Sequence, residues 1–170
     1  MEVIRRATDP GDWQQATALL HDYAEWIRAA VGIDPLVEQP AFADELCDLA
    51  GPYGGDAGFL FIAYDGELAV GTIAVRFHDD GAAELKRMYV RPIARGRGMA
   101  DRLVRRVLDD ASDRGCHSIW LESLPGVMDP AVALYRRHGF VDRGDVARTI
   151  HVDGIVVMER VLAAGRCRSA

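Results

Sequence analysis

Two arginines and two glycines lie close together in the segment Arg95-Gly-Arg-Gly-Met-Ala100. The segment follows a run of strand-forming residues and precedes a long amphipathic run. Glycines let the backbone approach a ligand closely, and the first turn of a helix leaves several N–H groups unpaired. Those amides, the positive end of the helix dipole and two guanidinium groups suit a phosphate or pyrophosphate. Residues 95–100 therefore predict an anion-binding site.

Two other phosphate-binding loops contain glycines at similar spacing. A Walker A loop needs Lys-Ser or Lys-Thr after its last glycine, whereas Met99 follows Gly98 here. A dinucleotide-binding fingerprint would use Gly96 and Gly98 and then a third small residue, where this chain has Asp101. Glu122 lies near the position of a ribose-binding acid, so the spacing alone leaves the dinucleotide alternative open.

The elements around this segment disfavour the dinucleotide alternative. Asp65-Gly66 and His78-Asp-Asp-Gly81 are tight-turn signals, and the apolar runs that they join predict three strands in an antiparallel meander. A dinucleotide-binding unit would not contain such a meander. The helix predicted after residues 95–100 makes the next strand parallel to the one that ends at Val90.

The periodicity predicts an α/β (α+β) fold with a central mixed, mostly antiparallel sheet flanked by helices. The strands are predicted at residues 2–6, 59–64, 68–77, 82–90, 117–121, 147–151 and 155–162. The helices are predicted at residues 13–30, around 42–49, at 98–114 and from a cap at Asp129 to residue 138, with a glycine-rich loop at 51–58. A single domain is expected over residues 1–162, with a frayed tail at 163–170.

Composition and charge narrow the classes of function. The 170 residues suffice for one domain with a sizeable core, and the formal net charge of −6 provides no basic field for nucleic acid. Cys47, Cys116 and Cys167 are far apart, and the histidines show no metal-ligand spacing, so no metal is expected. No signal peptide or membrane-spanning apolar run is evident, which predicts no membrane partner and a cytoplasmic location.

Two motifs carry a resemblance to a known family. Arg95, Gly98 and Ala100 match, position for position, the Gln/Arg-x-x-Gly-x-Gly/Ala motif of the GNAT superfamily of N-acetyltransferases. Residues 131–140 are similar to the Ala-x-x-Leu-Tyr-x-x-x-Gly-Phe block of that family. The predicted order of elements also resembles a GNAT-like single domain over nearly the whole chain. One departure is Met128, which stands where many members have an Asn that contacts the pantetheine arm.

The resemblance implies acetyl-CoA as the acyl donor, an amine of a small molecule or peptide as the acceptor, and no metal. It leaves a homodimer open. In the family, backbone amides of the central strand polarise the thioester carbonyl, and the glycine-rich loop holds the pyrophosphate. Carried over residue by residue, this cofactor-binding set comprises Met88, Tyr89, Val90, Arg95, Gly96, Arg97, Gly98, Met99 and Ala100.

The resemblance also implies a general acid and a general base. Tyr135 is the candidate acid, because a tyrosine at this place in the block often points at the cofactor sulfur; helical spacing alone would make it a core residue. Glu84 is the candidate base, because some members place a glutamate there that removes a proton through water. The alternative role for Glu84 is a structural pair with Lys86, and Glu122 is a second carboxylate that could face the same cleft.

Three aromatic residues, Trp13, Tyr23 and Trp26, either border the acceptor site or belong to the core. The function expected from the sequence is therefore an N-acetyltransferase that acts by direct attack of a primary amine. Two alternatives stay open. One is a non-catalytic acyl-CoA-binding sensor or interaction module, and the other is a transferase that uses a longer donor such as succinyl-CoA.

Overall fold

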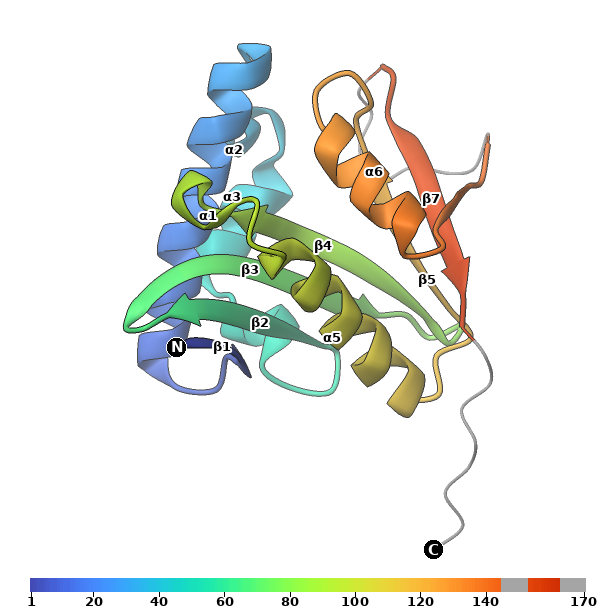
Figure 1. Ribbon diagram of the computed structural model, residues 1–170, viewed down its shortest axis with the longest axis horizontal. Helices are drawn as coiled ribbons and strands as arrows, with labels where there is room; N and C mark the ends of the chain where they lie inside the picture. The colour runs from blue at the N-terminus through green and yellow to red at the C-terminus, as the bar shows by residue number, and fades with distance from the viewer. Residues whose placement is uncertain (145–152, 163–170) are drawn as a thin grey trace, which may run out of the picture.

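The computed structural model describes residues 1–144 and 153–162, and in this part of the chain one seven-stranded sheet forms the centre (Figure 1). The order of the strands is β1-β2-β3-β4-β5-β7-β6, and β4–β5 is the parallel pair among antiparallel ones. The mixed, mostly antiparallel sheet predicted from the sequence is confirmed. The strands are β1 Glu2–Arg6, β2 Gly58–Asp65, β3 Leu68–Phe77, β4 Ala82–Val90, β5 Ser118–Ser123, β6 Val141–Asp142 and β7 Val156–Val161.

The long helix α1 has side-chain capping at its start and a glycine at its end, as its sequence predicts. The long helix α1 follows Asp9, whose carboxylate accepts a hydrogen bond from the Asp12 amide at 2.9 Å, and it stops at Gly32, which has a φ of 73°. The described helices are α1 Pro10–Val31, α2 Pro35–Glu38, α3 Pro40–Cys47, α4 Ala50–Tyr53, the 3₁₀ turn η1 Pro92–Ala94, α5 Met99–Asp113 and α6 Asp129–Arg137.

The helices cover the sheet from both faces, so each face has its own apolar core. Helix α5 packs Leu103 and Val107 into one core, together with Phe61 and Ile73 of the sheet. The helices α1 to α4 cover the opposite face, where α1 side chains such as Leu19 meet Leu60, Ile62 and Ala74. The sheet therefore lies between two helical layers, with α1 and α6 on either side of the place where β4 and β5 separate (Figure 1).

Strands β4 and β5 pair over a short length and then separate. Their parallel register joins Ala82–Glu84 to Ser118–Trp120 and ends there, although β4 continues to Val90. Strand β5 keeps its antiparallel pairing with β7 as far as Ser123. The sheet therefore opens between β4 and β5, and the part of β4 beyond Glu84 faces the gap (Figure 1).

Strand β4 is interrupted by a bulge inside its pairing with β3. Thr72 pairs with Tyr89 and Ala74 with Lys86, so Arg87 and Met88 together face the single residue Ile73. Arg87 has a φ of 56°, which is uncommon for a residue other than glycine. The pattern of residues 82–90 predicted a regular strand, so this bulge was not expected from the sequence.

Several predicted boundaries were wrong. The start of the predicted loop at 51–58 is the short helix α4, which buries the Tyr53 ring and places its hydroxyl 2.8 Å from Glu45 Oε1. The residue that caps α6 is Met128; Asp129 lies in the first turn and accepts a hydrogen bond from the Gly126 amide at 2.7 Å.

The end of the chain was predicted to form a hairpin of residues 147–151 and 155–162. The predicted strand at 147–151 and the predicted tail at 163–170 lie outside the described residues. Strand β7, predicted at 155–162, is present and pairs with the short strand β6 at Val141–Asp142, which the sequence analysis did not predict. Only two residues of β6 pair, which is too short a run for periodicity to detect.

Candidate active site

A cavity of about 480 Å³ lies in the gap between β4 and β5. Its wall is formed by β4 from Leu85 to Val90, by Glu122 and Ser123 of β5, and by parts of α1, the start of α5 and α6. Residues 95–100, the open part of β4 and Tyr135 therefore meet at one site. Bringing these three features together depends on the separation of the two parallel strands.

The loop before α5 has the backbone conformation of an anion cradle. Gly96 and Gly98 have φ values of 73° and 76°, and a Cβ atom added to either would meet no heavy atom within 4 Å. The first turn of α5 closes with a hydrogen bond from the Arg102 amide to the Gly98 carbonyl at 3.1 Å. The amides of Met99 and Ala100 precede that bond and belong to the unpaired first turn, where the helix dipole favours an anion. The open cradle and its donors fit a pyrophosphate.

The two arginines of the cradle differ in where their side chains go. Arg95 lines the cavity and is positioned by a hydrogen bond from its Nε to the Val90 carbonyl at 2.9 Å. The guanidinium of Arg97 instead forms ion pairs of 2.8 Å with both Glu2 and Asp65, on the side of β1 and β2. Of the two predicted guanidinium ligands, the structure brings Arg95 to the cavity and directs the side chain of Arg97 away from it.

Asp101 places a carboxylate on the cavity wall beside the cradle. This negative charge would repel a phosphate, but Asp101 is paired with the last residue of α6 and with the residue that follows it. His138 Nε2 lies 3.1 Å from Asp101 Oδ1, and Arg137 Nη2 lies 3.5 Å from Asp101 Oδ2. The positive charge of Arg137 reduces the repulsion between Asp101 and a bound phosphate. The two contacts also connect α5 with the end of α6.

Among residues 1–144 and 153–162, no strand pairs with the cavity side of β4 beyond Glu84. Met88, Tyr89 and Val90 line the cavity in this stretch, as the predicted cofactor-binding set requires. Backbone groups that would join a neighbouring strand are left to face the cavity. Amides in this position are suited to hydrogen-bond an oxygen on which negative charge develops.

Tyr135 lines the opposite wall, on α6, and is 5% exposed. Its ring packs edge-on against Phe140, with the ring centroids 5.6 Å apart. Burial raises the pKa of the Tyr135 hydroxyl well above its ordinary value, and the nearby Tyr23 hydroxyl adds to the effect. The phenol therefore stays protonated at physiological pH and is a proton donor rather than a base.

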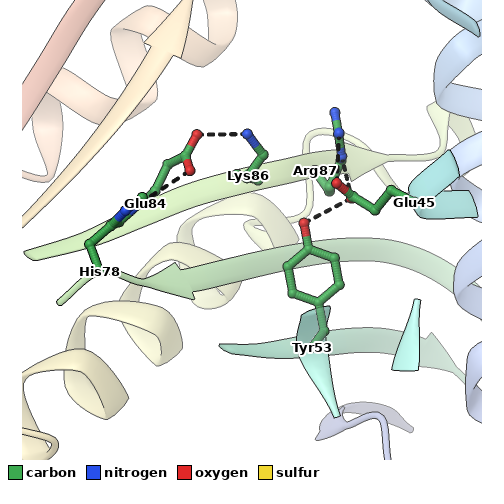
Figure 2. Close-up of polar contacts among 6 residues, drawn as sticks. All are labelled: Glu45, Tyr53, His78, Glu84, Lys86 and Arg87. Atoms are coloured by element: carbon green, nitrogen blue, oxygen red, sulfur yellow. Dashed lines mark hydrogen bonds and ion pairs between the residues drawn. The ribbon is translucent and has the colours of Figure 1, made fainter. Parts of the chain in front are cut away.

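The two carboxylates considered as bases lie in different positions. Glu84 is 4% exposed, and its carboxylate accepts a hydrogen bond from Lys86 Nζ at 2.6 Å and lies 3.4 Å from His78 Nε2 (Figure 2). It does not line the cavity, as far as the described residues define its wall. Glu122 does line the cavity, two residues beyond the last β5 residue that pairs with β4. The alternative role of Glu84, as a partner of Lys86, is thus present in the structure.

The aromatic residues of α1 fall into two groups. Tyr23 and Trp26 line the cavity with their rings stacked at 6.5 Å, and Tyr23 also lies 5.9 Å from the ring of Tyr89. All three residues, Trp13 included, pack against the core under α1. Tyr23 and Trp26 therefore take both of the roles left open by the sequence, whereas Trp13 is not among the described residues of the cavity wall.

A buried network beside the cavity was not predicted from the sequence. Arg87 donates two hydrogen bonds to Glu45 of α3 (Figure 2), at 2.7 and 3.0 Å. Its guanidinium also lies 3.8 Å from the centroid of the Phe42 ring. The signal that could have found it is the pair of adjacent cations Lys86-Arg87 within an otherwise alternating strand. Strict alternation would place one of them in the apolar core under α5, so two cations in succession indicate a break.

Met128 occupies the position where an amide side chain was expected. It lines the cavity as the residue that precedes α6, and its sulfur lies 3.9 Å from the Ser123 hydroxyl. A thioether is only a weak hydrogen-bond acceptor. Ser123, which the sequence analysis did not single out, therefore supplies a hydroxyl next to the position from which the amide is missing.

Comparison with known proteins identifies the family. The model of the acetyltransferase (GNAT) family matches residues 20–140. The chain belongs to this family. Relatives within it include a protein of Azospirillum brasilense named IAA acetyltransferase, 38% identical over 107 residues, and streptothricin acetyltransferase of Streptomyces lavendulae, 36% identical over 94 residues. The matched segments cover 62% and 53% of this chain, and 68% and 49% of those two proteins.

Solved structures show the same fold. A GNAT-family acetyltransferase from Staphylococcus aureus Mu50 superposes with a TM-score of 0.77 at 18% identity, over 96% of this chain and all of the other (100%). The PaiA N-acetyltransferase of Thermoplasma acidophilum, solved in complex with coenzyme A, gives a TM-score of 0.73 at 14% identity, over 95% and 99% of the two chains. The GNAT fold predicted from the two motifs is confirmed.

Residues 1–144 and 153–162 contain no helix that is long and apolar enough to cross a membrane. They also contain no group of three or more His, Cys, Asp or Glu side chains that could hold a metal ion.

Proposed function

We propose that this GNAT protein is an acetyl-CoA-dependent N-acetyltransferase that acetylates the primary amine of a small molecule or peptide by direct attack. The observation that carries the proposal is a single cavity that is lined by the anion cradle, the open edge of β4 and Tyr135. Acyl transfer needs these three parts: an anchor for the donor, N–H groups for the developing oxyanion and an acid for the leaving thiolate. Membership of the family supports acetyl-CoA as the donor.

The cradle would hold the donor through its pyrophosphate, using the amides of residues 96–100 and the guanidinium of Arg95. Amides of Met88, Tyr89 and Val90 would donate to the thioester oxygen as negative charge develops on it. The amine nitrogen then forms a bond to the acetyl carbon while the carbon–sulfur bond breaks. Tyr135 gives its proton to the sulfur, which leaves as the thiol of CoA. Holding both reactants in one cavity supplies a further part of the acceleration.

The amine must lose a proton, and two carboxylates are proposed for this step. Glu84, the base expected from the sequence, lies behind Lys86 and would act through water. Glu122 lines the cavity and could accept the proton directly or through one water. The position of Glu122 on the cavity wall favours it. The proton is later exchanged with solvent, while the phenolate of Tyr135 recovers its proton in the same way.

The names of the relatives do not identify the acceptor of this chain. One is named for IAA and another for streptothricin, which are different molecules, and each name describes that protein alone. The donor could also carry a longer acyl group such as succinyl. The alternative from another class is a module that binds acyl-CoA without turnover, which the replacement of the family amide by Met128 keeps open.

Release of CoA thiol, measured over a panel of amines with acetyl-CoA and succinyl-CoA, tests the proposal. An increase in melting temperature with acetyl-CoA reports binding independently of turnover. Amine-dependent CoA release is the expected result. Tight binding of acetyl-CoA without turnover on any amine would instead support the non-catalytic module.

A further inference from the structure

The bulge in β4 places two cationic side chains in succession on the same face of the sheet. Lys86 pairs with Ala74, whose side chain belongs to the core under α1, so Lys86 lies on that face. Regular alternation would direct Arg87 to the other face, but its guanidinium lies against the Phe42 ring of α3. Met88, the next residue, packs into the core on the α5 side, so alternation slips by one residue at Arg87.

Both cations line the cavity, and each is held from behind by a buried carboxylate. Glu84 holds Lys86 at 2.6 Å and Glu45 holds Arg87 at 2.7 Å, as Figure 2 shows; among the described residues neither carboxylate lines the cavity. The side chains of Lys86 and Arg87 are 16% and 11% exposed. The contacts to Glu84 and Glu45 use one donor of the ammonium and two of the guanidinium. A lysine has three donors and an arginine five, so within the part of the chain that the structure describes both cations retain donors for an anionic group.

The carboxylate of Glu122 on β5 lies across the gap between β4 and β5 from these cations. Glu84 and Trp120 are the last paired residues of β4 and β5, and Lys86 and Glu122 are each two positions further on. Because the strands are parallel and side chains alternate, Lys86 and Glu122 lie on the same face at the same height. Both line the cavity, which therefore has a positive wall on β4 and a negative charge on β5.

The third wall of this part of the cavity is aromatic. Tyr23 and Trp26 of α1 stack at 6.5 Å, and Tyr89 of β4 lies 5.9 Å from Tyr23. A surface of this kind buries the apolar part of a small ligand and contacts it with ring faces and edges. A ligand that matches all three walls has an anionic end, a cationic end and an apolar body.

We infer that the acceptor is a small amino acid-like molecule, with its carboxylate at Lys86 and Arg87 and its amine toward Glu122. The apolar side group of this acceptor lies against Tyr23 and Trp26. This inference rests on the proposed acetyltransferase function and assigns the class of substrate to the same cavity. Without the bulge at Arg87, regular alternation would bring only one of the two cations to this face of the sheet.

Matched acceptors test the inference: L-phenylalanine, its amide and phenethylamine share a ring and an amine but differ in the carboxylate. Further α-amino acids with their amides and decarboxylated amines extend the panel. We expect the carboxylate to raise kcat/KM by about tenfold or more, because acceptors without it leave buried donors unpaired. The preference is the ratio of kcat/KM for an acceptor with the carboxylate to kcat/KM for its counterpart without it. In Lys86→Met this ratio should fall toward one. The double variant Glu84→Gln/Lys86→Met should show the same loss without an unpaired buried carboxylate.

Arg106→Gln is the matched control, because Arg106 is a half-exposed cation of α5 paired with Asp110 and lies outside the cavity wall. This variant should keep the full preference. Equal turnover of acceptors with and without a carboxylate, or a preference that survives in both Lys86 variants, would overturn the inference and leave the proposed function standing. Calorimetric titration of the CoA-loaded protein covers the case of no turnover. There, failure of every α-amino acid to bind overturns the inference, and binding of amino acids but not of their amides supports it.

Discussion

Arg87 of the bulged strand β4 and Glu45 of helix α3 form a bidentate pair, with Nε and Nη2 of the guanidinium 2.7 and 3.0 Å from the two carboxylate oxygens. The hydroxyl of Tyr53 donates a third hydrogen bond to the same carboxylate, at 2.8 Å. Burial alone would raise the pKa of the Glu45 carboxyl, but the hydrogen bonds and charge of Arg87, with the Tyr53 bond, outweigh it and hold the pKa below its ordinary value. The pair thus joins the irregular part of β4 to the helical layer.

Arg87→Met should destabilise the protein by about 3–5 kcal/mol, because it leaves the buried Glu45 carboxylate without its charge partner. Urea denaturation measures the loss. Asp22→Asn is the matched control, since Asp22 and Arg91 form a 2.6 Å pair that is partly exposed. This control should cost less than about 1 kcal/mol. Equal losses in the two variants would contradict a special role for the buried pair.

The lowered pKa of Glu45 predicts an acid-dependent part of the stability. A carboxylate with a lower pKa in the folded state stabilises fully above the unfolded value, about 4.3 for glutamate. That contribution is lost as the pH falls below this value through the folded-state pKa. Melting temperatures from pH 7 to 3 should therefore fall more in the parent protein than in Glu45→Gln, which has no charge to lose. Parallel curves for the two proteins would show that the pair is not responsible.

Much of the fold could be predicted because its signals are local. Turn dipeptides such as Asp65-Gly66, the apolar stripe of α5 and the glycines of residues 95–100 act over a few residues, and each lies where the sequence indicated. The bulge at Arg87 could not be predicted in this way, because an extra residue in a strand is defined by its partner strand. The helix α4 was missed because burial of Tyr53, a tertiary effect, outweighs the loop preference of Gly51-Pro52.

In the candidate site, too, the features set by local sequence were predicted and those set by strand pairing were not. Residues 95–100 and Tyr135 were found from motifs, and apart from the side chain of Arg97 the structure brings them to one cavity. The relative positions of Glu84 and Glu122 depend on where β4 and β5 stop pairing. A sequence shows that both carboxylates lie near strand ends, but not that one lies within the paired part and the other beyond it.

Gly98→Val should abolish binding of acetyl-CoA, because the side chain would enter the cradle space needed by the phosphates. A valine at a φ of 76° is also strained, so a loss of stability is expected in addition. Gly32→Val is the matched control, with a φ of 73° and equally open surroundings at the end of α1. Both variants should lose stability, and only Gly98→Val should lose the increase in melting temperature with acetyl-CoA. Undiminished binding by a folded Gly98→Val protein would remove the cradle from the proposed site.

Tyr135→Phe should lower turnover by about a hundredfold while leaving acetyl-CoA affinity nearly unchanged, because it keeps the ring and removes the proton donor. The raised pKa of Tyr135 keeps the phenol protonated as the pH rises, so its ionisation should produce no basic limb in the pH–rate profile below about pH 10. Tyr64→Phe is the control: its hydroxyl contacts Asp12 at 3.2 Å, away from the cavity. Unchanged turnover in folded Tyr135→Phe would assign Tyr135 to packing alone.

The last prediction separates the two candidate bases, Glu122 on the cavity wall and Glu84 behind Lys86. We expect Glu122→Gln to lower kcat/KM by about a hundredfold and to remove the acid limb of the pH–rate profile, because the amide keeps the shape but accepts no proton. Glu84→Gln should have a smaller effect and should retain the acid limb, since it acts through the position of Lys86. Acetyl-CoA affinity is measured in both variants, because a base contributes little to it. Loss of the acid limb in Glu84→Gln, with full rate in Glu122→Gln, would return the role of base to Glu84 acting through water.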